Sequence, residues 1–360
     1  MPGPLQGVRV VEFAGLGPGP FAAMLLADGG ADVLRIDRPR PPVDGGALVR
    51  GRPMLHLDLK DEAARAEALA IIRRADVLIE GFRPGVMERL DLGPEVCLAA
   101  NPRLVYGRMT GWGQDGPRAQ QAGHDINYLS STGALRSFSR VGQAPVPPLN
   151  LVADYGGGGM LLAFGVLAAL HARHDTGRGQ VIDAAMVDGV SLLMTGIWSR
   201  LSQGRWPAAP GGNELDTGAP FYEVYATADA EYMAVGSIEP QFWARLLQGL
   251  ELSPDNLPDQ WDRARWPEAK EILARAFATR SRDEWAAIFE PLDACVTPVL
   301  GLDEALADPH LAARGTLLDT DVGTQPAAAP RLSDTPFSAA EDPGTAELTL
   351  RRWGVRSHEP

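Results

Sequence analysis

Short apolar runs alternate with helix-like segments through the first third of the chain. Runs rich in β-branched and other apolar residues predict strands at residues 8–13, 33–37, 54–58, 76–80 and 104–109. Helical patterns lie between them at 21–27, where Pro20 suits the first helical position, and at 61–75. Strands that alternate with helices form parallel sheets with right-handed crossovers, so the pattern predicts an α/β, doubly wound domain.

The pattern continues with a long apolar helix at 157–174, a strand at 180–185 and a helix at 186–202, and then it changes. A Gly/Pro-rich stretch without period precedes a predicted hairpin of residues 221–227 and 231–237 and helices at 240–248, 267–279 and 282–289. We therefore expect a large Rossmann-like domain and a smaller α+β domain. The predicted boundaries are a large domain at 1–203 completed by 331–360, a linker at 204–220, a small domain at 221–308 and a returning linker at 309–330.

Composition is that of an ordinary globular protein, with 45% hydrophobic and 22% charged residues in a chain of 360. The formal net charge of −13 and the lack of a basic patch argue against a nucleic-acid partner. Lys60 and Lys270 are the only lysines among the 33 basic residues. The guanidinium groups that remain suit phosphate, so a few well-placed arginines could hold a phosphorylated ligand.

The cysteine spacing and the length of the apolar stretches predict the cellular compartment of the protein. Cys97 and Cys295 lie far apart and form no metal-binding spacing, which favours a reducing compartment and predicts no metal site. No basic segment followed by an apolar core opens the chain. The most apolar stretch, residues 160–170, is shorter than the ~20 residues that cross a bilayer. These features predict a cytoplasmic protein without a membrane partner.

The segment GLGPGP at 15–20 imitates a dinucleotide-binding loop, and Asp37 even falls where an acid would bind a ribose. That loop works through backbone N–H groups that face a pyrophosphate. Pro18 and Pro20 have no N–H, and Pro20 stands where the third glycine should be. The sequence therefore argues against NAD.

Two arginine-bearing loops follow predicted strands. Arg38 stands between Asp37 and Pro39, and Arg83 lies in the segment GFRPG with Arg89 close behind. The carboxyl ends of parallel strands are where α/β sheets bind ligands, which favours phosphate capture. The alternatives are a solvated strand end at Arg38 and a surface turn at Arg83.

Three titratable residues stand in unusual surroundings. His124 is suited to proton transfer near neutral pH, although a hydrogen-bonded structural histidine is the alternative. Asp154 precedes four glycines and an apolar helix, where it could cap the helix, or the glycines could permit close approach by a ligand or by another backbone. Glu239 opens a helix of the small domain, and its alternative is a helix-start carboxylate.

Taken together, these stretches resemble the family of class III coenzyme-A transferases (CaiB/BaiF), and within it the α-methylacyl-CoA racemase branch. The resemblance covers most of the chain and is densest in VRVVEFAGLGPGP, ADVLRIDRP, DVLIEGFRPGVMERLDLGP, YGRMTGWGQDGP, AGHDINYLSSTGAL, PLNLVADYGGGGM, GQVIDAAMVDG, GAPFYEVY and VGSIEPQF. It implies a Rossmann-like large domain and a smaller domain, with two chains interlocked as a homodimer. The active site would lie between the large domain of one chain and the small domain of the other.

The reaction that the resemblance implies is inversion at C2 of a 2-methylacyl-CoA thioester, in lipid and fatty acid metabolism. His124 and Asp154 would be the two acid/base groups, and Glu239 would orient the imidazole. The backbone N–H of Asp125 would hold the oxygen of the enolate. Coenzyme A would be carried as part of the substrate, with no metal and no other cofactor. The residues implied to contact this substrate are Arg38, Leu59, Lys60, Gly81, Phe82, Arg83, Arg89, Met109, Gly123 and Tyr128.

Two other functions compete with the racemase. In a coenzyme-A transferase of the same family, the residue at Asp154 would be a nucleophile that forms a mixed anhydride. At the positions that match 123–125, such transferases have a pattern that looks like Gly-aromatic-Asp, with glutamine just after it. They also carry a glycine-rich loop that covers the aspartate. This chain has Gly-His-Asp, then Ser130 and Ser131, and its VGSIEP segment has no glycine run, so the racemase is favoured. A non-catalytic acyl-CoA-binding protein would keep the arginines but would need neither His124 nor Asp154.

Overall fold

The computed structural model describes residues 3–39, 46–207, 209–321, 323–339 and 344–355. They form two compact units. Unit 1 consists of the chain up to Thr132, Pro148–Met194 and the chain from Ala313 onward, and unit 2 of Gly133–Pro147 and Thr195–Ala312. The division differs from the predicted boundaries, since residues 133–147 and 195–220 group with unit 2 and residues 313–330 with unit 1. Residues 209–220 form a packed loop, in which the buried Asp216 carboxylate accepts the N–H groups of Gly211 and Asn213.

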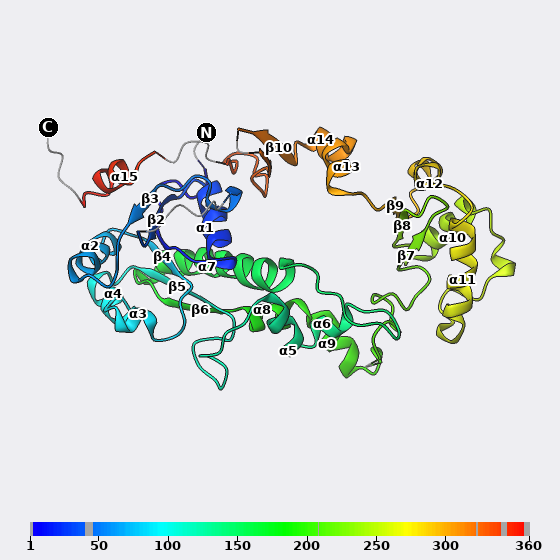
Figure 1. Cartoon of the computed structure of the whole chain (residues 1–360), viewed down its shortest axis with the longest axis horizontal. Helices are drawn as coiled ribbons and strands as arrows, with labels where there is room; N and C mark the ends of the chain where they lie inside the picture. Colours follow the sequence, from blue (N-terminus) through cyan, green and yellow to red (C-terminus); the bar gives the residue numbers. More distant parts are fainter. Residues whose placement is uncertain (1–2, 40–45, 208, 322, 340–343, 356–360) are drawn as a thin grey trace. The chain divides into compact units, whose positions relative to one another are not determined.

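A sheet of six parallel strands forms the centre of unit 1 (Figure 1). The strand order is β3-β2-β1-β4-β5-β6, which is the Rossmann order, so the predicted α/β doubly wound domain is confirmed. Each strand that the sequence predicted in this domain is present, with its ends moved by one or two residues. The strands are β1 (Arg9–Phe13), β2 (Asp32–Asp37), β3 (Met54–His56), β4 (Val77–Glu80), β5 (Val105–Thr110) and β6 (Val181–Ala185).

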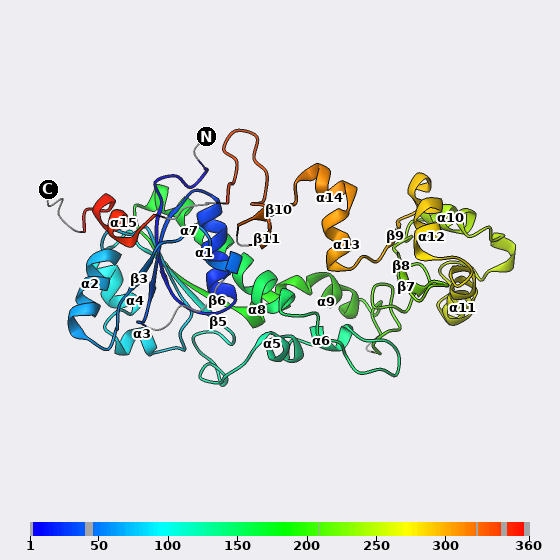
Figure 2. The same cartoon turned by 45° about the horizontal axis from the view of Figure 1, so that its top comes forward.

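Helices cover both faces of this sheet (Figure 2). On one face lie α1 (Pro18–Asp28) and α7 (Leu161–Thr176), which contact each other and the strands. On the other face, α2 (Glu62–Ile72), α4 (Pro94–Ala100) and α15 (Ala346–Arg352) close a core around the buried Tyr106 and Leu34. The other elements of unit 1 are η1 (Gly46–Val49), α3 (Val86–Arg89), α5 (Asp125–Ser131), η2 (Leu151–Met160), α8 (Met186–Leu193), β10 (Leu317–Thr320) and β11 (Gly323–Pro326).

Three predicted helices have different bounds. The first begins at Pro18 rather than near Pro20, with Gly17 as its N-cap. The helix predicted at 186–202 is divided at Met194 into α8 and α9 (Thr195–Ser202), where Thr195 and Gly196 are poor helix formers. The helix predicted at 157–174 begins earlier, at Leu151, and its residues up to Met160 form the π-helical η2, a rare form that is frequent at functional sites.

Together η2 and α7 form one helix, Leu151–Thr176, that by length and composition alone could cross a membrane, and it is longer than the apolar stretch noted in the sequence. Its buried residues include Ala153, Leu162 and Val166. The helix contacts α1, α8 and strands β5 and β6. This side of the helix therefore belongs to the core of unit 1.

A buried cluster of charges lies under the start of α1. Glu12 of β1 pairs with Arg35 of β2, which is its register partner, and with Arg52 at 2.8 Å. Arg52 also donates to the carbonyl oxygen of Pro20 at 3.0 Å. All three charged residues are at most 5% exposed. Because Arg52 donates to the Pro20 carbonyl, the cluster holds the first turn of α1.

Unit 2 is a small α+β unit with an antiparallel sheet in the order β7-β8-β9. The predicted hairpin is present, and aromatic side chains fill the core beside it, among them Phe221, Trp266, Phe277 and Trp285. Its elements are α6 (Ala134–Ser137), α9, β7 (Glu223–Ala226), β8 (Tyr232–Val235), α10 (Pro240–Gly249), η3 (Pro254–Asn256), η4 (Arg263–Arg265), α11 (Trp266–Phe277), α12 (Arg282–Phe289), η5 (Glu290–Leu292), β9 (Val296–Pro298) and α13 (Leu302–Ala307), followed by α14 (Pro309–Arg314).

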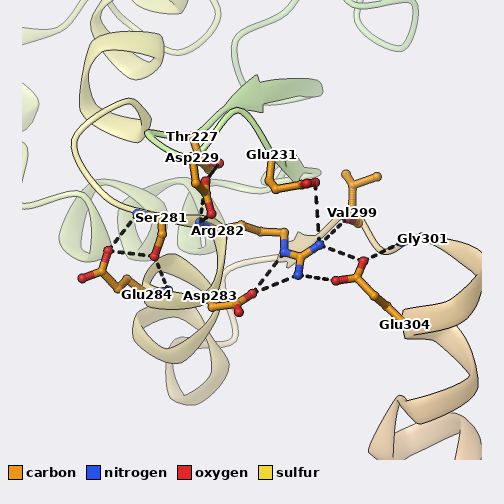
Figure 3. A network of polar contacts seen from close by, with 10 residues as sticks. All are labelled: Thr227, Asp229, Glu231, Ser281, Arg282, Asp283, Glu284, Val299, Gly301 and Glu304. Atoms are coloured by element: carbon orange, nitrogen blue, oxygen red, sulfur yellow. Dashed lines mark hydrogen bonds and ion pairs between the residues drawn. The ribbon is translucent and has the colours of Figure 1, made fainter.

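Arg282, at the start of α12, joins three segments of unit 2 (Figure 3). Its guanidinium pairs with Glu304 of α13 at 2.8 Å and with Asp283, and its backbone N–H donates to Asp229 of the hairpin turn. The hydrogen bonds from Arg282 lower the pKa of Glu304 to about 2. The network attaches α13 to the body of the unit.

Candidate functional site

A cavity of about 500 Å³ opens at the carboxyl ends of β1, β4 and β5. Between β1 and β4 the strand order reverses, and this switch point is where doubly wound sheets bind ligands. All of the lining residues belong to unit 1. They are Phe13, Gly15, Leu16, Gly17, Pro18, Gly19, Pro20, Gly81, Phe82, Arg83, Pro84, Met109, Thr110, Gly111, Trp112, Ala119, Gln121, Ala122, Gly123, His124, Tyr128, Asp154 and Met186.

His124 is the N-cap of α5, and Asp125 is the first residue of that helix. The backbone N–H of His124 donates to the side chain of Asn127 at 3.0 Å, which fixes the turn that presents the imidazole. His124 is exposed and lines the cavity. Such a group can exchange protons with a bound ligand.

Asp154 lies in the first turn of η2 and lines the same cavity. Burial raises the pKa of its carboxyl above the ordinary value, and the negative charge of Asp125 raises it further. A hydrogen bond from Asn150 at 3.3 Å and the charge of His124 act in the opposite direction. A carboxyl group with a raised pKa takes up and returns a proton closer to neutral pH than an ordinary carboxyl group does.

The absence of a side chain at Gly17 allows Asp154 to lie beside the loop before α1. A Cβ atom at residue 17 would lie 3.1 Å from Oδ2 of Asp154, and the backbone has φ +63°, which favours glycine. The carboxylate therefore lies against the Gly17 backbone, which no larger residue would allow without a shift.

The glycines that follow Asp154 serve the packing of helices. A Cβ at Gly157 would lie 2.8 Å from the backbone nitrogen of Val190 in α8, and one at Gly159 would lie 2.7 Å from the ring of Phe21 in α1. The close approach that the sequence suggested is therefore an approach of neighbouring helices. These contacts hold the start of η2, and with it Asp154, against α1 and α8.

Tyr128 forms the wall beside the two titratable residues. Its ring packs against Gly123 and Gly111 and meets Trp112 edge-on, with ring centroids 5.0 Å apart. Burial raises the pKa of Tyr128 to about 12, and the charges of Asp154 and Asp125 contribute. The phenol is therefore neutral at physiological pH and can act as a hydrogen-bond donor.

The loop after β4 carries Gly81, Phe82 and Arg83 into the cavity wall. The buried Glu80 carboxylate accepts the N–H of Phe82 at 2.7 Å and the Nε–H of Arg108 at 3.0 Å. Burial raises the pKa of Glu80 to about 7. The loop is thus tied to the sheet at the point where it leaves β4.

Eight of the sequence-predicted site residues line the cavity together, and six do not. The residues in the lining are His124, Asp154, Gly81, Phe82, Arg83, Met109, Gly123 and Tyr128. Outside it, Arg38 and Lys60 are exposed at the carboxyl ends of β2 and β3, Leu59 packs on the core, and Arg89 ends α3. Asp125 is buried behind His124.

Glu239 is the N-cap of α10 in unit 2, so the helix start that the sequence predicted there is confirmed. It is exposed. Its hydrogen bond to His124 stays a prediction.

The sequence did not point to Gly17, Trp112 or Met186 as site residues. Gly17 stands in the GLGPGP segment, which lines the cavity although its prolines argue against a dinucleotide. The position of that segment between a strand and a helix was the sequence signal that could have indicated a ligand site there. Trp112 and Met186 line the cavity because of tertiary packing, which no local sequence pattern indicates.

An α/β protein with a cavity at a Rossmann switch point, lined by a histidine and an aspartate, is the class that this fold and site define. The family model for CoA-transferase family III matches residues 5–346, and the chain belongs to that family. It is 48% identical to proteins named alpha-methylacyl-CoA racemase from mouse and from human, over 99% of this chain and 94% of each relative. A crystal structure of a CaiB/BaiF family protein from Brucella suis superposes with a TM-score of 0.84 at 25% identity and covers 99% of this chain and all of that one.

Proposed function

We propose that this protein is a racemase that inverts the configuration at C2 of 2-methylacyl-CoA thioesters. One group removes the C2 proton, and the electron pair of the C–H bond passes to the thioester oxygen as an enolate. The other group then delivers a proton to the opposite face of C2. His124 and Asp154 are the two groups, and each serves as base for one epimer. The similarity to two proteins named as racemases supports this reaction.

The observation that carries the proposal is that His124 and Asp154, from two different elements, line one cavity. The raised pKa of Asp154 suits a two-base reaction, in which one group must be protonated when the other is not. The backbone N–H of Asp125, at the first position of α5, has no acceptor within the helix and can donate to the enolate oxygen. Glu239 would orient the imidazole of His124.

Coenzyme A is proposed to enter as part of the substrate and to lie along the carboxyl edge of the sheet. Arg38, Lys60, Arg83 and Arg89 follow strands β2, β3 and β4 at this edge. In a chain with a net charge of −13, this grouping supports an anionic ligand. Met109 and Met186 offer an adaptable apolar surface to the acyl chain of a fatty acid. The reaction needs no metal and no redox cofactor, because only protons are transferred.

We also propose a homodimer. An exposed apolar stripe runs along η2 and α7 through Met160, Phe164 and Leu167, which are 53%, 69% and 42% exposed. Leu193 of α8 extends it beside Gly156. An apolar stripe of this kind on a helix marks an interaction site, and a second copy of this chain is its proposed occupant. The cytoplasmic location stays a prediction.

The experiment that tests the reaction uses one epimer of a 2-methylacyl-CoA in D₂O, without an acceptor acid. The wild-type protein is expected to place deuterium at C2 and to produce the other epimer, followed by mass spectrometry and chiral chromatography. A transferase needs an acceptor carboxylate and leaves C2 unlabelled. Coenzyme A transfer with an unlabelled C2 would therefore overturn the racemase.

Single variants separate the two bases. His124→Ala and Asp154→Asn are each expected to lose inversion, by about 10²–10⁴-fold, while retaining deuterium exchange with one epimer. The preferred epimer should differ between the two variants, since each retains the base that serves one face. If Asp154→Asn abolishes exchange from both epimers and His124→Ala changes little, Asp154 acts alone.

A further inference from the structure

The side chain of Asp125 connects the two elements that carry the proposed bases. Its Oδ2 atom accepts the backbone N–H of Ala153 at 2.7 Å and the backbone N–H of Asp154 at 2.8 Å. Asp125 is also the residue directly after His124 in the chain. One carboxylate therefore lies next to one base along the chain and is hydrogen-bonded to the backbone of the other.

This carboxylate is almost completely enclosed. Asp125 is 3% exposed, and its Oδ1 atom is buried without a hydrogen-bond partner among the described residues. A buried acceptor without a partner is costly, so the position is not explained by solubility or by chance. The two N–H groups that donate to Oδ2 offset part of that cost.

The first turn of η2 needs such an acceptor. The opening N–H groups of a helix have no partner within it and are normally capped by the preceding side chain. Here Asn150 is the N-cap residue but its side chain makes no capping bond, and its amide donates to the Asp154 carboxylate. Asp125 thus supplies the cap for η2 from a different helix, α5.

We propose that the Asp125 side chain is a positioning residue, which locks α5 to the start of η2 and thereby sets the spacing between His124 and Asp154. This inference rests on the proposed function and is separate from the role of the Asp125 backbone N–H at the enolate oxygen. A group misplaced by about 1 Å can lose about 10²-fold in rate, so a fixed spacing is valuable in a reaction that needs a base on each face of one carbon.

The charge of Asp125 adds a second effect. The charged and polar groups that face Asp154 from η2 and α5 are Asn150, His124, Asp125 and Tyr128, and the Asp125 charge raises the pKa of Asp154. The neighbouring helices α1 and α8 carry only Asp28, at the far end of α1, and Asp188, which is exposed. Removal of the Asp125 charge should therefore lower the pKa of Asp154.

Two substitutions separate geometry from charge. Asp125→Asn keeps a carbonyl oxygen for the two N–H groups but removes the charge, whereas Asp125→Ala removes both. The Asn variant is expected to retain inversion, with the limb of the pH profile that belongs to Asp154 moved to lower pH. The Ala variant is expected to lose inversion about 10²-fold while retaining C2 deuterium exchange from either epimer, because both bases are still present.

Hydrogen exchange measured on the substrate-free protein supplies a readout that does not depend on activity. Peptides that cover residues 151–156 are expected to exchange faster in Asp125→Ala and to remain protected in Asp125→Asn. Asp188→Asn, the same chemical change at an exposed acid on a neighbouring helix, is the matched control and should match wild type. The Asn variant and its pH profile keep the test available if the Ala variant does not fold.

The outcomes separate this inference from the proposed function. An Ala variant with the wild-type ratio of inversion to exchange, or with unchanged protection of residues 151–156, would overturn the positioning role of Asp125. An unmoved pH profile in the Asn variant would overturn the charge effect. If the wild-type protein itself shows no C2 exchange, the racemase is lost, while the protection measurement still decides whether Asp125 locks η2.

Discussion

Glu80 is expected to make the stability of unit 1 depend on pH near neutrality. It ends β4 and is paired in register with Arg108 of β5, and that one guanidinium also binds Glu88 at 2.9 Å. Two carboxylates share one cation, and Glu80 is the buried one, at 1% exposure. Burial raises its pKa from 4.5 to about 7. The folded protein therefore holds this proton more tightly than the unfolded chain does.

The magnitude follows from the difference between the two pKa values. Each pH unit between them is worth about 1.4 kcal/mol, so the full contribution of Glu80 is roughly 3 kcal/mol. It is present below pH 4.5 and is lost as pH rises through about 7. Of this amount, about 2.5 kcal/mol should disappear between about pH 5 and pH 8.

The perturbation is Glu80→Gln, which is neutral at every pH. Urea unfolding at a series of pH values, read by pulsed hydrogen exchange on peptides from β4 and β5, reports the free energy of unfolding of unit 1. Relative to wild type, the Gln variant is expected to gain about 2.5 kcal/mol as pH rises from about 5 to 8. Glu95→Gln, at an exposed glutamate of the same unit, is the control and should show no such gain. Parallel curves for wild type and Glu80→Gln would refute the reasoning.

Two further predictions concern the ligand edge and the apolar stripe. Arg83→Ala should weaken binding of the acyl-CoA about 10–100-fold, measured by calorimetry, because one charge-assisted hydrogen bond is lost. The control, Arg178→Ala at the amino end of β6, should leave the affinity unchanged. Equal affinities of the Arg83→Ala variant and wild type would mean that Arg83 lies in a surface turn without a ligand. Phe164→Glu should reduce the sedimentation mass from dimer to monomer, because it places a charge on the stripe, while Leu302→Glu, at a 91% exposed residue, should not. A wild-type protein that is monomeric and floats with liposomes would instead assign the stripe to a lipid surface.

The strands of unit 1 could be predicted from the sequence because each is a short, continuous apolar run between turn residues. The strand order could not, since it depends on which strands pair in space. The buried Arg35 illustrates the difference. A charged residue within the run VLRID suggests contact with solvent, yet Arg35 is buried and pairs with Glu12, which also pairs with Arg52. The register of β1 with β2 brings Glu12 and Arg35 together, and Arg52 comes from the segment before β3.

The site was predicted unevenly for the same reason. His124 and Asp154 could be named because histidine and a glycine-flanked aspartate are chemically conspicuous, and because their motifs resemble a family. The π-helical form of η2 could not be predicted, since its glycines indicated a close approach by a ligand or by another backbone and did not tell the two apart. The Asp125 side chain was overlooked because its partners, Ala153 and Asp154, lie nearly 30 residues away and contribute only backbone N–H groups.

The α1 loop shows how one Rossmann edge is adapted to another ligand. In dinucleotide-binding proteins the turn after the first strand leaves backbone N–H groups free for a pyrophosphate. Here Pro18 and Pro20 remove two of those donors, and Asp154 lies against Gly17, which places a carboxylate close to the start of the helix. A negative charge at this position would repel a pyrophosphate. The same switch point is thus suited to proton transfer, with the basic residues that favour phosphate placed after β2, β3 and β4 instead.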